Sequence, residues 1–245
     1  MSIIRNICFL ILLPIILFGQ QQNYENKAFR TDENQKKTSY KKIDGNPYLF
    51  KDWVKADLIH LDQEKIEDAF IRLDLHQENL EVKDYGSVFV DENIMEIGDD
   101  KFIVLTDKYY KKITIAKSDN PKVLKDSDVD SLFLMKGIHK DYIDKYAIVL
   151  YDGKTIKLIK EIDIQLRESK VNSPGTVWTE KKFIRKKSYA LIIEKEKKQI
   201  KLKEKDLYKV LGNKEELKKY IKANKLKVKK EPAAVQLLAY WESLK

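Results

Sequence analysis

Residues 146–159 read YAIVLYDGKTIKLI, and this stretch decides the fold class of the chain. Two apolar runs, 146–151 and 155–159, lie on either side of the pair Asp152-Gly153. An Asp-Gly pair between two such runs is a strong hairpin signal, because both residues tolerate the positive φ angles of a type I′ turn. The stretch therefore predicts an antiparallel β-hairpin with a type I′ turn, and we expect the chain around it to continue as a sheet.

Short runs with β-like alternation extend from this hairpin in both directions. The spacers between them are rich in Gly, Asp and Asn, which are the usual residues of tight turns. The expected strands are 53–61, 66–75, 80–83, 88–90, 94–97 and 102–106 before the hairpin, and 162–166, 176–184, 189–194 and 199–202 after it. The section 118–144 breaks the pattern and predicts loops, with one apolar island at 132–135. Together these runs predict a mainly β domain over residues 45–204, an antiparallel meander forming a curved or two-layer sheet.

The period of the apolar residues changes from two to 3.6 near the C-terminus. Residues 206–211 are expected to form a short helix that ends at Gly212, and Asn213 is expected to cap a second helix. Pro232 suits the first turn of a third helix, whose apolar stripe is Leu237, Trp241 and Leu244. We therefore predict a cluster of three short helices over the basic segment 205–245. We expect it to pack on the β domain, with a partner helix or a membrane as the alternatives.

The N-terminus has the pattern of a secretory signal peptide. Arg5 precedes an apolar run over residues 7–18, which is followed by Gly19 and a polar stretch. Charged, apolar and small-residue regions in this order are typical of an export signal. The run is shorter than the roughly 20 residues of a membrane-spanning helix. We therefore expect residues 1–19 to be removed and the protein to be periplasmic or secreted; an uncleaved anchor is the alternative.

The single cysteine of the chain, Cys8, lies within this apolar run. A bacterial lipoprotein carries its cysteine at the cleavage site, so lipid attachment is not expected. Without Cys8, the mature chain has no thiol for disulfides, nucleophilic catalysis or metal binding. Residues 20–44 are polar and show no apolar period, and they predict a disordered leader.

Charge is distributed unevenly along the chain. Charged residues make up 36% of the sequence, and only five of the basic residues are arginines. Residues 181–245 contain 21 basic and 8 acidic residues, a balance of +13, whereas residues 1–180 contain 27 basic and 31 acidic residues, a balance of −4. The basic end indicates either lysines that keep a folded tail soluble or an anionic partner. Nucleic acid is the weaker interpretation, because arginine, the usual partner of phosphates and base edges, is scarce.

The spacing of potential metal ligands does not match a known metal motif. His60, His76 and His139 lie far apart in the sequence, and the alternation places His60 and His76 on exposed strand faces. Residues 126–130 read DSDVD and begin like a calcium loop, but Ser131 stands where the sharp turn requires glycine. No metal and no other cofactor is therefore expected, with a looser calcium site on this loop as the alternative.

Motifs of covalent and nucleotide chemistry are absent from the sequence. No Gly-x-Ser-x-Gly occurs, the Ser-x-x-Lys at 39–42 lies in the predicted leader, and the eight glycines form no phosphate-binding loop. Glycoside hydrolysis needs only two suitably spaced carboxylates, and the candidates on predicted strands are Glu67, Asp74, Glu96 and Asp163. Exposed aromatic rings can bind glycans by stacking, although burial is their commoner role. The candidates for stacking are Trp53, Trp178 and Tyr189.

Several short motifs resemble a known group of proteins. They are GNPYL at 45–49, IRLDL at 71–75, LYDGKT at 150–155 and the closing helices over 207–244. Together they resemble a family of exported β-rich proteins of Gram-negative bacteria, over most of residues 45–245. The resemblance implies export and a β-rich fold, and it implies no activity and no site residues. Arg72-Leu73 differs from the Arg-Tyr pair of the family pattern.

These observations predict an exported, non-catalytic binding or structural module of the bacterial envelope. We expect a monomer with no catalytic, cofactor-binding or metal residues and no membrane-spanning segment after signal cleavage. Its expected partner is an envelope protein or an anionic polysaccharide rather than a nucleic acid. Two alternatives remain open. One is a hydrolase of envelope polymers or glycans that uses paired carboxylates, and the other is a cationic module that docks through residues 205–245 on anionic lipid or polysaccharide.

Overall fold

The computed structural model of the chain describes residues 40, 43–61, 63, 65–83, 94–97, 100–105, 110–125, 129–143, 145–173 and 176–245. For the two strands between residues 94 and 105, only the backbone is described. The predicted signal peptide, most of the predicted leader, the candidate strand 88–90 and the first residues of the candidate calcium loop lie outside these ranges. Within them, no helix combines the length and the apolar character needed to cross a bilayer.

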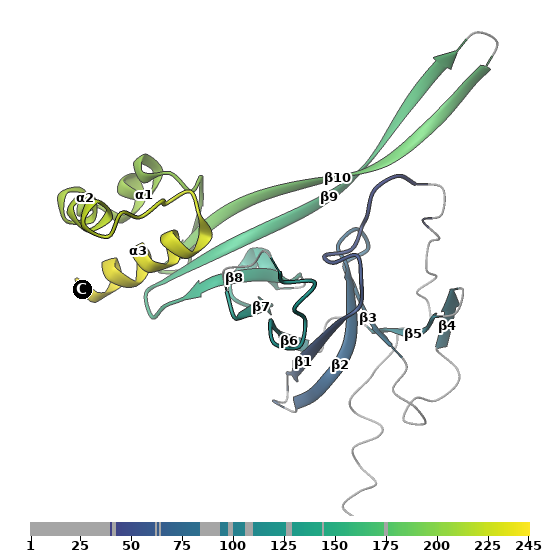
Figure 1. Cartoon of the computed structure of the whole chain (residues 1–245), viewed down its shortest axis with the longest axis horizontal. Coiled ribbons are helices and arrows are strands. Elements are labelled where there is room, and N and C mark those ends of the chain that lie inside the picture. Colours follow the sequence, from purple (N-terminus) through teal and green to yellow (C-terminus); the bar gives the residue numbers. More distant parts are fainter. Residues whose placement is uncertain are drawn as a thin grey trace, which may run out of the picture.

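Eleven strands in the described part of the chain form one antiparallel sheet (Figure 1). They are β1 (Val54–His60), β2 (Lys65–Asp74), β3 (Asn79–Lys83), β4 (Ile94–Ile97), β5 (Asp100–Leu105), β6 (Tyr110–Ala116), β7 (Ser131–Met135), β8 (Ala147–Asp152), β9 (Ile156–Ser173), β10 (Thr176–Ile193) and β11 (Glu196–Ile200). Their order across the sheet is β11-β10-β9-β8-β7-β6-β1-β2-β3-β5-β4. Most neighbours are consecutive along the chain, so the predicted antiparallel meander is confirmed.

The hairpin predicted at 146–159 is confirmed, but its turn is of another type. β8 and β9 pair as antiparallel neighbours. Neither Asp152 nor Gly153 has a positive φ, so the predicted type I′ turn is wrong. A Cβ atom on Gly153 would lie 2.6 Å from the Tyr151 ring and 2.8 Å from a carboxylate oxygen of Glu242. Glycine is needed here because neighbouring side chains approach the backbone closely, and not because of its backbone angles.

β9 and β10 form one long ribbon. The two 18-residue strands pair over their full length, from Ile156 opposite Ile193 to Ser173 opposite Thr176. One end of the ribbon lies beside the helices, and the other extends away from the rest of the molecule (Figure 1). β9 joins the predicted strand segments 155–159 and 162–166, and β10 joins 176–184 and 189–194. Sequence alternation located these segments but did not indicate that they are continuous.

Two central strands are not predicted by the sequence. β7 forms where only an apolar island is expected, and β6 lies in a segment to which no strand is assigned. β6 pairs with β1 on one side and β7 on the other. Ile113 and Ile115 of β6 alternate and are fully buried. Two alternating residues are a weak local signal, and the strand is stabilised by the neighbours that cover both of its edges.

One face of the sheet carries two apolar cores. The first core contains alternate residues of β1, β2, β3, β6, β7 and β8, and the second contains the base of the ribbon, β11 and the helices. Ile148 of the first core lies opposite Lys160, so Leu158 of the second core, two residues along β9, points to the same face. Leu150 packs against both cores. A smaller cluster around Tyr142 lies on the other face.

Three helices follow β11, as predicted: α1 (Glu204–Leu211), α2 (Lys214–Ala223) and α3 (Glu231–Ser243). α1 ends at Gly212, and Pro232 lies in the first turn of α3, both as predicted. Asn213 is the N-cap residue of α2, as predicted, but it adopts the left-handed conformation and its side chain makes no capping hydrogen bond. Trp241 from the predicted apolar stripe is buried, whereas Leu244 is 41% exposed because α3 ends before it.

Glu242 attaches the end of α3 to the β8–β9 hairpin. Its carboxylate accepts hydrogen bonds from the Tyr151 hydroxyl at 2.8 Å, and from the backbone N–H and hydroxyl of Thr155 at 2.6 and 3.0 Å. The Thr155 N–H is the main cause that lowers the pKa of Glu242, to about 2. The carboxylate is therefore ionised at neutral pH and holds α3 against the sheet.

Residues before Gly45 also contact the sheet. The Tyr40 hydroxyl donates to Asp74 at 2.7 Å, and the Tyr40 ring packs edge-on against Phe183 of β10, with 5.1 Å between centroids. The backbone of Asp44 forms a bridge with the edge of β10. Ordered contacts therefore begin earlier than the predicted start at Gly45, and this segment ties the middle of the ribbon to β2.

Candidate functional site

Two pockets lie beside the ribbon near its base, and Ile162 of β9 lines both. Successive residues of a strand point to opposite faces of a sheet. In the pairing of β9 with β10, Lys160 lies opposite Tyr189, and Glu161 lies opposite Ser188. Lys160 and Tyr189 line one pocket, and Glu161 and Ser188 line the other. The alternation of one strand thus separates a cationic site from an anionic one.

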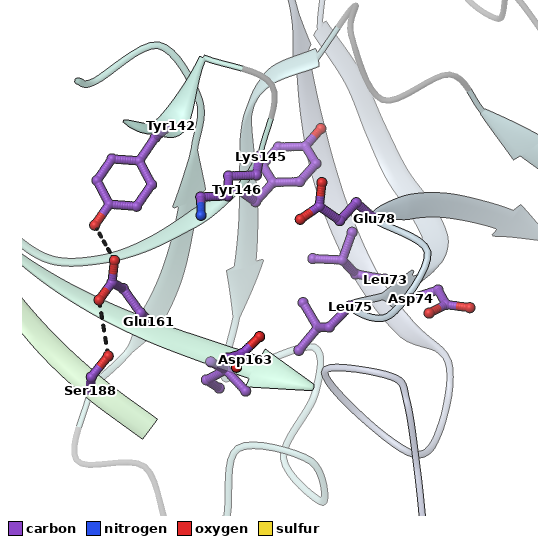
Figure 2. A pocket seen from close by; sticks show the side chains of 11 residues that line it. Leu73, Asp74, Leu75, Glu78, Tyr142, Lys145, Tyr146, Glu161, Asp163 and Ser188 are labelled. Atoms are coloured by element: carbon purple, nitrogen blue, oxygen red, sulfur yellow. Dashed lines mark hydrogen bonds between the residues drawn. The ribbon is translucent and has the colours of Figure 1, made fainter. Parts of the chain in front are cut away.

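The acidic pocket encloses about 230 Å³ between the β2–β3 turn, the segment before β8 and the ribbon. Its lining residues are Leu73, Asp74, Leu75, Glu78, Tyr142, Lys145, Tyr146, Glu161, Ile162, Asp163 and Ser188 (Figure 2). Four of these side chains carry a carboxylate, and only Lys145 carries a positive charge. A 3-10 helix, Lys140–Tyr142, brings the Tyr142 hydroxyl to the carboxylate of Glu161.

Glu161 is held by four side chains. It accepts hydrogen bonds from Tyr142 at 2.6 Å, Lys197 at 2.7 Å, Gln199 at 2.7 Å and Ser188 at 2.9 Å. Burial alone would raise the pKa of Glu161, but these hydrogen bonds outweigh burial and lower the pKa to about 2. The carboxylate is therefore ionised at neutral pH. It cannot supply the proton that a general acid must donate.

This network predicts how stability depends on pH. The pKa of Glu161 is lowered from 4.5 to about 2 on folding, so its ionised form stabilises the protein above pH 4.5, and this contribution is lost as the pH falls towards 2. Glu161→Gln should lower the free energy of unfolding by about 2–3 kcal/mol at neutral pH and flatten the pH profile in that window. Urea titrations at a series of pH values measure both effects.

The control for this prediction is Glu168→Gln. The Glu168 side chain is 52% exposed on the ribbon and pairs there with Lys181. Exposed pairs of this kind contribute about 0–1 kcal/mol, so its pH profile should follow that of the parent protein. Parallel profiles for the parent and Glu161→Gln would contradict the role assigned to Glu161.

Two of the four carboxylates predicted for hydrolysis, Asp74 and Asp163, line the acidic pocket. Asp74 is fully buried, and both of its oxygens accept hydrogen bonds, one from Tyr40 and the other from two backbone N–H groups of the following turn. In Figure 2 the Asp74 side chain lies on the far side of the pocket from Glu161. Asp74 therefore acts as a structural acceptor for the turn after β2.

The other two predicted carboxylates lie elsewhere. Glu67 is exposed on β2 and pairs with Lys65 at 2.7 Å. The side chain of Glu96, on β4, lies outside the described residues. The described part of the chain therefore does not assemble the four candidates into one site.

The basic cavity encloses about 530 Å³ where the two cores meet. Its apolar wall comes from both cores, and its charged wall comes from the ribbon and the start of α3. The apolar and aromatic lining residues are Leu49, Phe50, Leu124, Val129, Leu132, Ile148, Leu150, Ile162, Tyr189 and Pro232. The charged lining residues are Lys160, Arg185, Lys187, Lys229, Lys230 and Glu231.

Glu231 is the single carboxylate among the lining residues of the basic cavity, which include five cations. It accepts a hydrogen bond from Tyr189 at 2.7 Å, pairs with Lys160 at 2.9 Å and lies 3.9 Å from Lys187. Burial acts to raise the pKa of Glu231, but the hydrogen bonds from Tyr189 and Lys160 outweigh it and lower the pKa. One carboxylate cannot neutralise five cations, so the cavity keeps a positive charge.

Arg185 contributes a cation that forms no ion pair with any described residue. Its guanidinium donates hydrogen bonds to the backbone carbonyls of Tyr48 and Leu49, the latter at 3.0 Å. Burial lowers the pKa of Arg185, as expected of a charge that is partly removed from water without a compensating anion. A guanidinium has five N–H donors, so the side chain keeps donors for an anionic group in the basic cavity.

The histidines do not form a metal site. His60 is only 9% exposed, with its ring edge-on to Tyr110, so its predicted exposed position is wrong. His76 is exposed, as predicted. The Nε2–H of His139 donates to the backbone carbonyl of Lys195 in the β10–β11 turn, at 3.1 Å. Among the residues that the structure describes, no three His, Cys, Asp or Glu side chains are grouped so that they could hold a metal ion.

The three aromatic residues considered for glycan stacking lie in different places. The Trp53 ring covers the guanidinium of Arg72, at 4.5 Å from its centroid. Trp178 is 43% exposed in the outer half of the ribbon, and Tyr189 lines the basic cavity. They do not form a common stacking surface.

Sequence reasoning missed the basic cavity. A signal was present, because Lys160 and Ile162 alternate on one strand and Lys187 and Tyr189 alternate on the next. This pattern reads equally well as an exposed strand face. Only the covering of that face by α3 and by the segment around Leu49 turns it into a cavity.

The two pockets differ in whether the protein neutralises the charge of their lining residues. The acidic pocket has its central carboxylate saturated by the protein's own donors, whereas the basic cavity retains charge that is not neutralised. No protein-family model, no curated protein and no solved structure matches the chain.

Proposed function

We propose that the protein is an exported, non-catalytic binding module whose basic cavity holds an anionic amphiphile, a single acyl chain with a carboxylate or phosphate headgroup. The observation that carries this proposal is the separation of charge within one cavity. Leu132 and Ile148 provide apolar lining on β7 and β8, and Arg185 and Lys187 provide charged lining on the ribbon. An acyl chain gains about 0.8 kcal/mol for each buried CH₂ group, and the headgroup gains charge-assisted hydrogen bonds.

The size of the basic cavity supports the same ligand class. Its volume of about 530 Å³ falls within the range of roughly 300–1,000 Å³ that is usual for small-molecule sites. A sugar would leave the apolar wall uncovered, and a neutral lipid would leave desolvated cations without a partner. An anionic amphiphile covers the apolar lining residues with its acyl chain and pairs the cations with its headgroup.

Binding is favoured over hydrolysis by the state of the carboxylates. Glu161 is ionised at neutral pH, because its pKa is lowered to about 2. The two oxygens of Asp74 are occupied by protein donors. Neither group is arranged as a general acid. The predicted signal peptide is the reason for proposing that the protein is exported.

Calorimetric titration of the purified protein with laurate, dodecyl phosphate and dodecanol tests the proposal. Both anions should bind. Lys187→Glu should weaken both by about 10- to 100-fold, because it removes a charged partner of the headgroup. The matched control is Lys186→Glu, which makes the same change of charge on the neighbouring residue, on the opposite face of β10. It should keep the affinity of the parent protein.

Three outcomes would contradict the proposal. Absence of laurate binding by the parent protein would remove the ligand class. An equal loss of affinity in Lys186→Glu and Lys187→Glu would show a general charge effect rather than a contact in the basic cavity. Acetate or inorganic phosphate binding as tightly as the matching amphiphile would show an anion site that does not use the apolar wall.

A further inference from the structure

A run of exposed lysines begins on α2. No acidic residue occurs between Glu216 and Glu231. All lysines in this interval are exposed. We call them the lysine surface, which consists of Lys218, Lys219, Lys222, Lys225, Lys227, Lys229 and Lys230.

The lysine surface leads from α2 to the basic cavity. α2 buries Leu217 and Ile221 in the second core. Lys218, Lys219 and Lys222 are exposed, and residues three and four apart are neighbours on a helix, so these three lie together on its outer side. The other four follow on the connection to α3, and the last two of them line the basic cavity.

None of the seven lysines forms an ion pair with a residue that the structure describes. Some lysines elsewhere are paired, as in Lys182 with Asp44 at 2.6 Å and Lys197 with Glu161 at 2.7 Å. The seven lysines are distinguished by their concentration in an interval that contains no acidic residue. A concentration of like charges repels itself and disfavours the compact state. Solubility requires only charges of both signs spread over the surface. The clustering therefore favours an anionic surface as the partner.

The composition of the lysine surface favours a lipid bilayer. It contains no arginine, and a lysine ammonium acts as a compact point charge without the planar fork that recognises single phosphates. Clustered lysines of this kind are attracted by the diffuse negative potential of anionic lipids. A bilayer also supplies acyl chains to the adjoining basic cavity, which an anionic polysaccharide does not.

We propose that the lysine surface docks the protein on anionic lipid bilayers, where the basic cavity takes up its amphiphile. The docking step rests on the lysines alone. The uptake step rests on the proposed function of the basic cavity. The two steps are separable by experiment, because Lys218, Lys219 and Lys222 do not line the cavity.

Cosedimentation with phosphatidylcholine vesicles, with and without phosphatidylglycerol, tests the docking step. The protein should bind only the anionic vesicles, and binding should weaken with salt, because the Debye length falls from about 10 Å at 0.1 M to about 3 Å at 1 M. Lys218→Gln/Lys219→Gln/Lys222→Gln should weaken binding by about 100-fold. Glutamine has a helix propensity close to that of lysine, and far-UV circular dichroism checks that α2 is retained.

The matched control is Lys122→Gln/Lys170→Gln/Lys186→Gln. It removes the same charge from three exposed lysines outside the lysine surface and should bind anionic vesicles like the parent protein. An equal loss in both triple variants, or no vesicle binding by the parent, overturns the docking step. Retention on a soluble anionic polysaccharide but not on anionic vesicles overturns it as well.

Laurate titration in vesicle-free buffer separates docking on a bilayer from ligand binding in the basic cavity. The variant of the lysine surface should bind laurate like the parent protein. If the parent protein binds anionic vesicles but not laurate, the docking step is supported and the uptake step is contradicted. If the parent protein binds laurate but not vesicles, the proposed ligand of the basic cavity is supported and the docking step is contradicted.

Discussion

Trp241→Ala is expected to lower the free energy of unfolding by about 3–5 kcal/mol. The Trp241 side chain is 4% exposed in the second core, and its indole N–H donates to the backbone carbonyl of Leu211 at 2.9 Å. Truncation to alanine opens a cavity between α1 and α3 and leaves this carbonyl without its donor. The loss of packing and the unsatisfied acceptor act in the same direction.

Leu244→Ala is the matched control for Trp241→Ala. Leu244 follows the same helix but is 41% exposed, so its truncation should cost no more than about 0.5 kcal/mol. Urea unfolding followed by circular dichroism measures both variants. Losses of similar size in the two variants would contradict the assignment of Trp241 to the centre of the second core.

Glu81→Ala is expected to cost about 3–5 kcal/mol, because it leaves a buried cation without its anion. Glu81 is 1% exposed on β3. One of its oxygens accepts a hydrogen bond from Nε of Arg72 at 2.9 Å and forms an ion pair with Nη2 at 2.8 Å. The Arg72 guanidinium is stacked on Tyr48 and Trp53, at 4.1 and 4.5 Å from the ring centroids. Water has little access to this cation, so it cannot replace the lost carboxylate.

Two further variants test whether charge is the cause of this loss. Arg72→Met/Glu81→Leu should recover most of the stability, because apolar side chains in place of a buried pair leave no unpaired charge. Glu67→Gln removes an exposed carboxylate that is paired with Lys65 on β2 and should cost no more than about 1 kcal/mol. If thermal or urea unfolding gave equal losses for Glu81→Ala and Glu67→Gln, the buried pair would not have the role assigned to it.

The basic cavity lies at a position that neither core fills. The sheet passes from the first core to the second at β8, β9 and β10. On the face that both cores share, the ribbon presents Lys160, Arg185 and Lys187 there instead of apolar side chains. Dry packing against these groups would require removing charge from water, which costs several kcal/mol per ion. The space between the two cores therefore stays open and charged, and it forms the basic cavity.

Features with strong local signals were predictable from the sequence. The hairpin at 146–159 follows from alternation on both sides of a turn pair, and α1 and α3 follow from the change of period together with Gly212 and Pro232. The prediction of a type I′ turn was wrong. Glycine is required at position 153 because the carboxylate of Glu242, a residue distant in sequence, occupies the space beside its backbone. Such a contact has no trace in the local sequence.

Hydrophobic period and turn residues by themselves determined that the chain forms an antiparallel meander closed by three helices, because these signals act between residues close in sequence. Only the tertiary structure decided that β6 lies beside β1, that β9 and β10 form one ribbon, and that the two cores share a face. The candidate site depends on these features of the tertiary structure. The basic cavity combines residues from 49–50, 124–132, 148–150, 160–162, 185–189 and 229–232. Whether a lysine on a strand meets water, a carboxylate or an apolar wall depends on which distant segments fold over it.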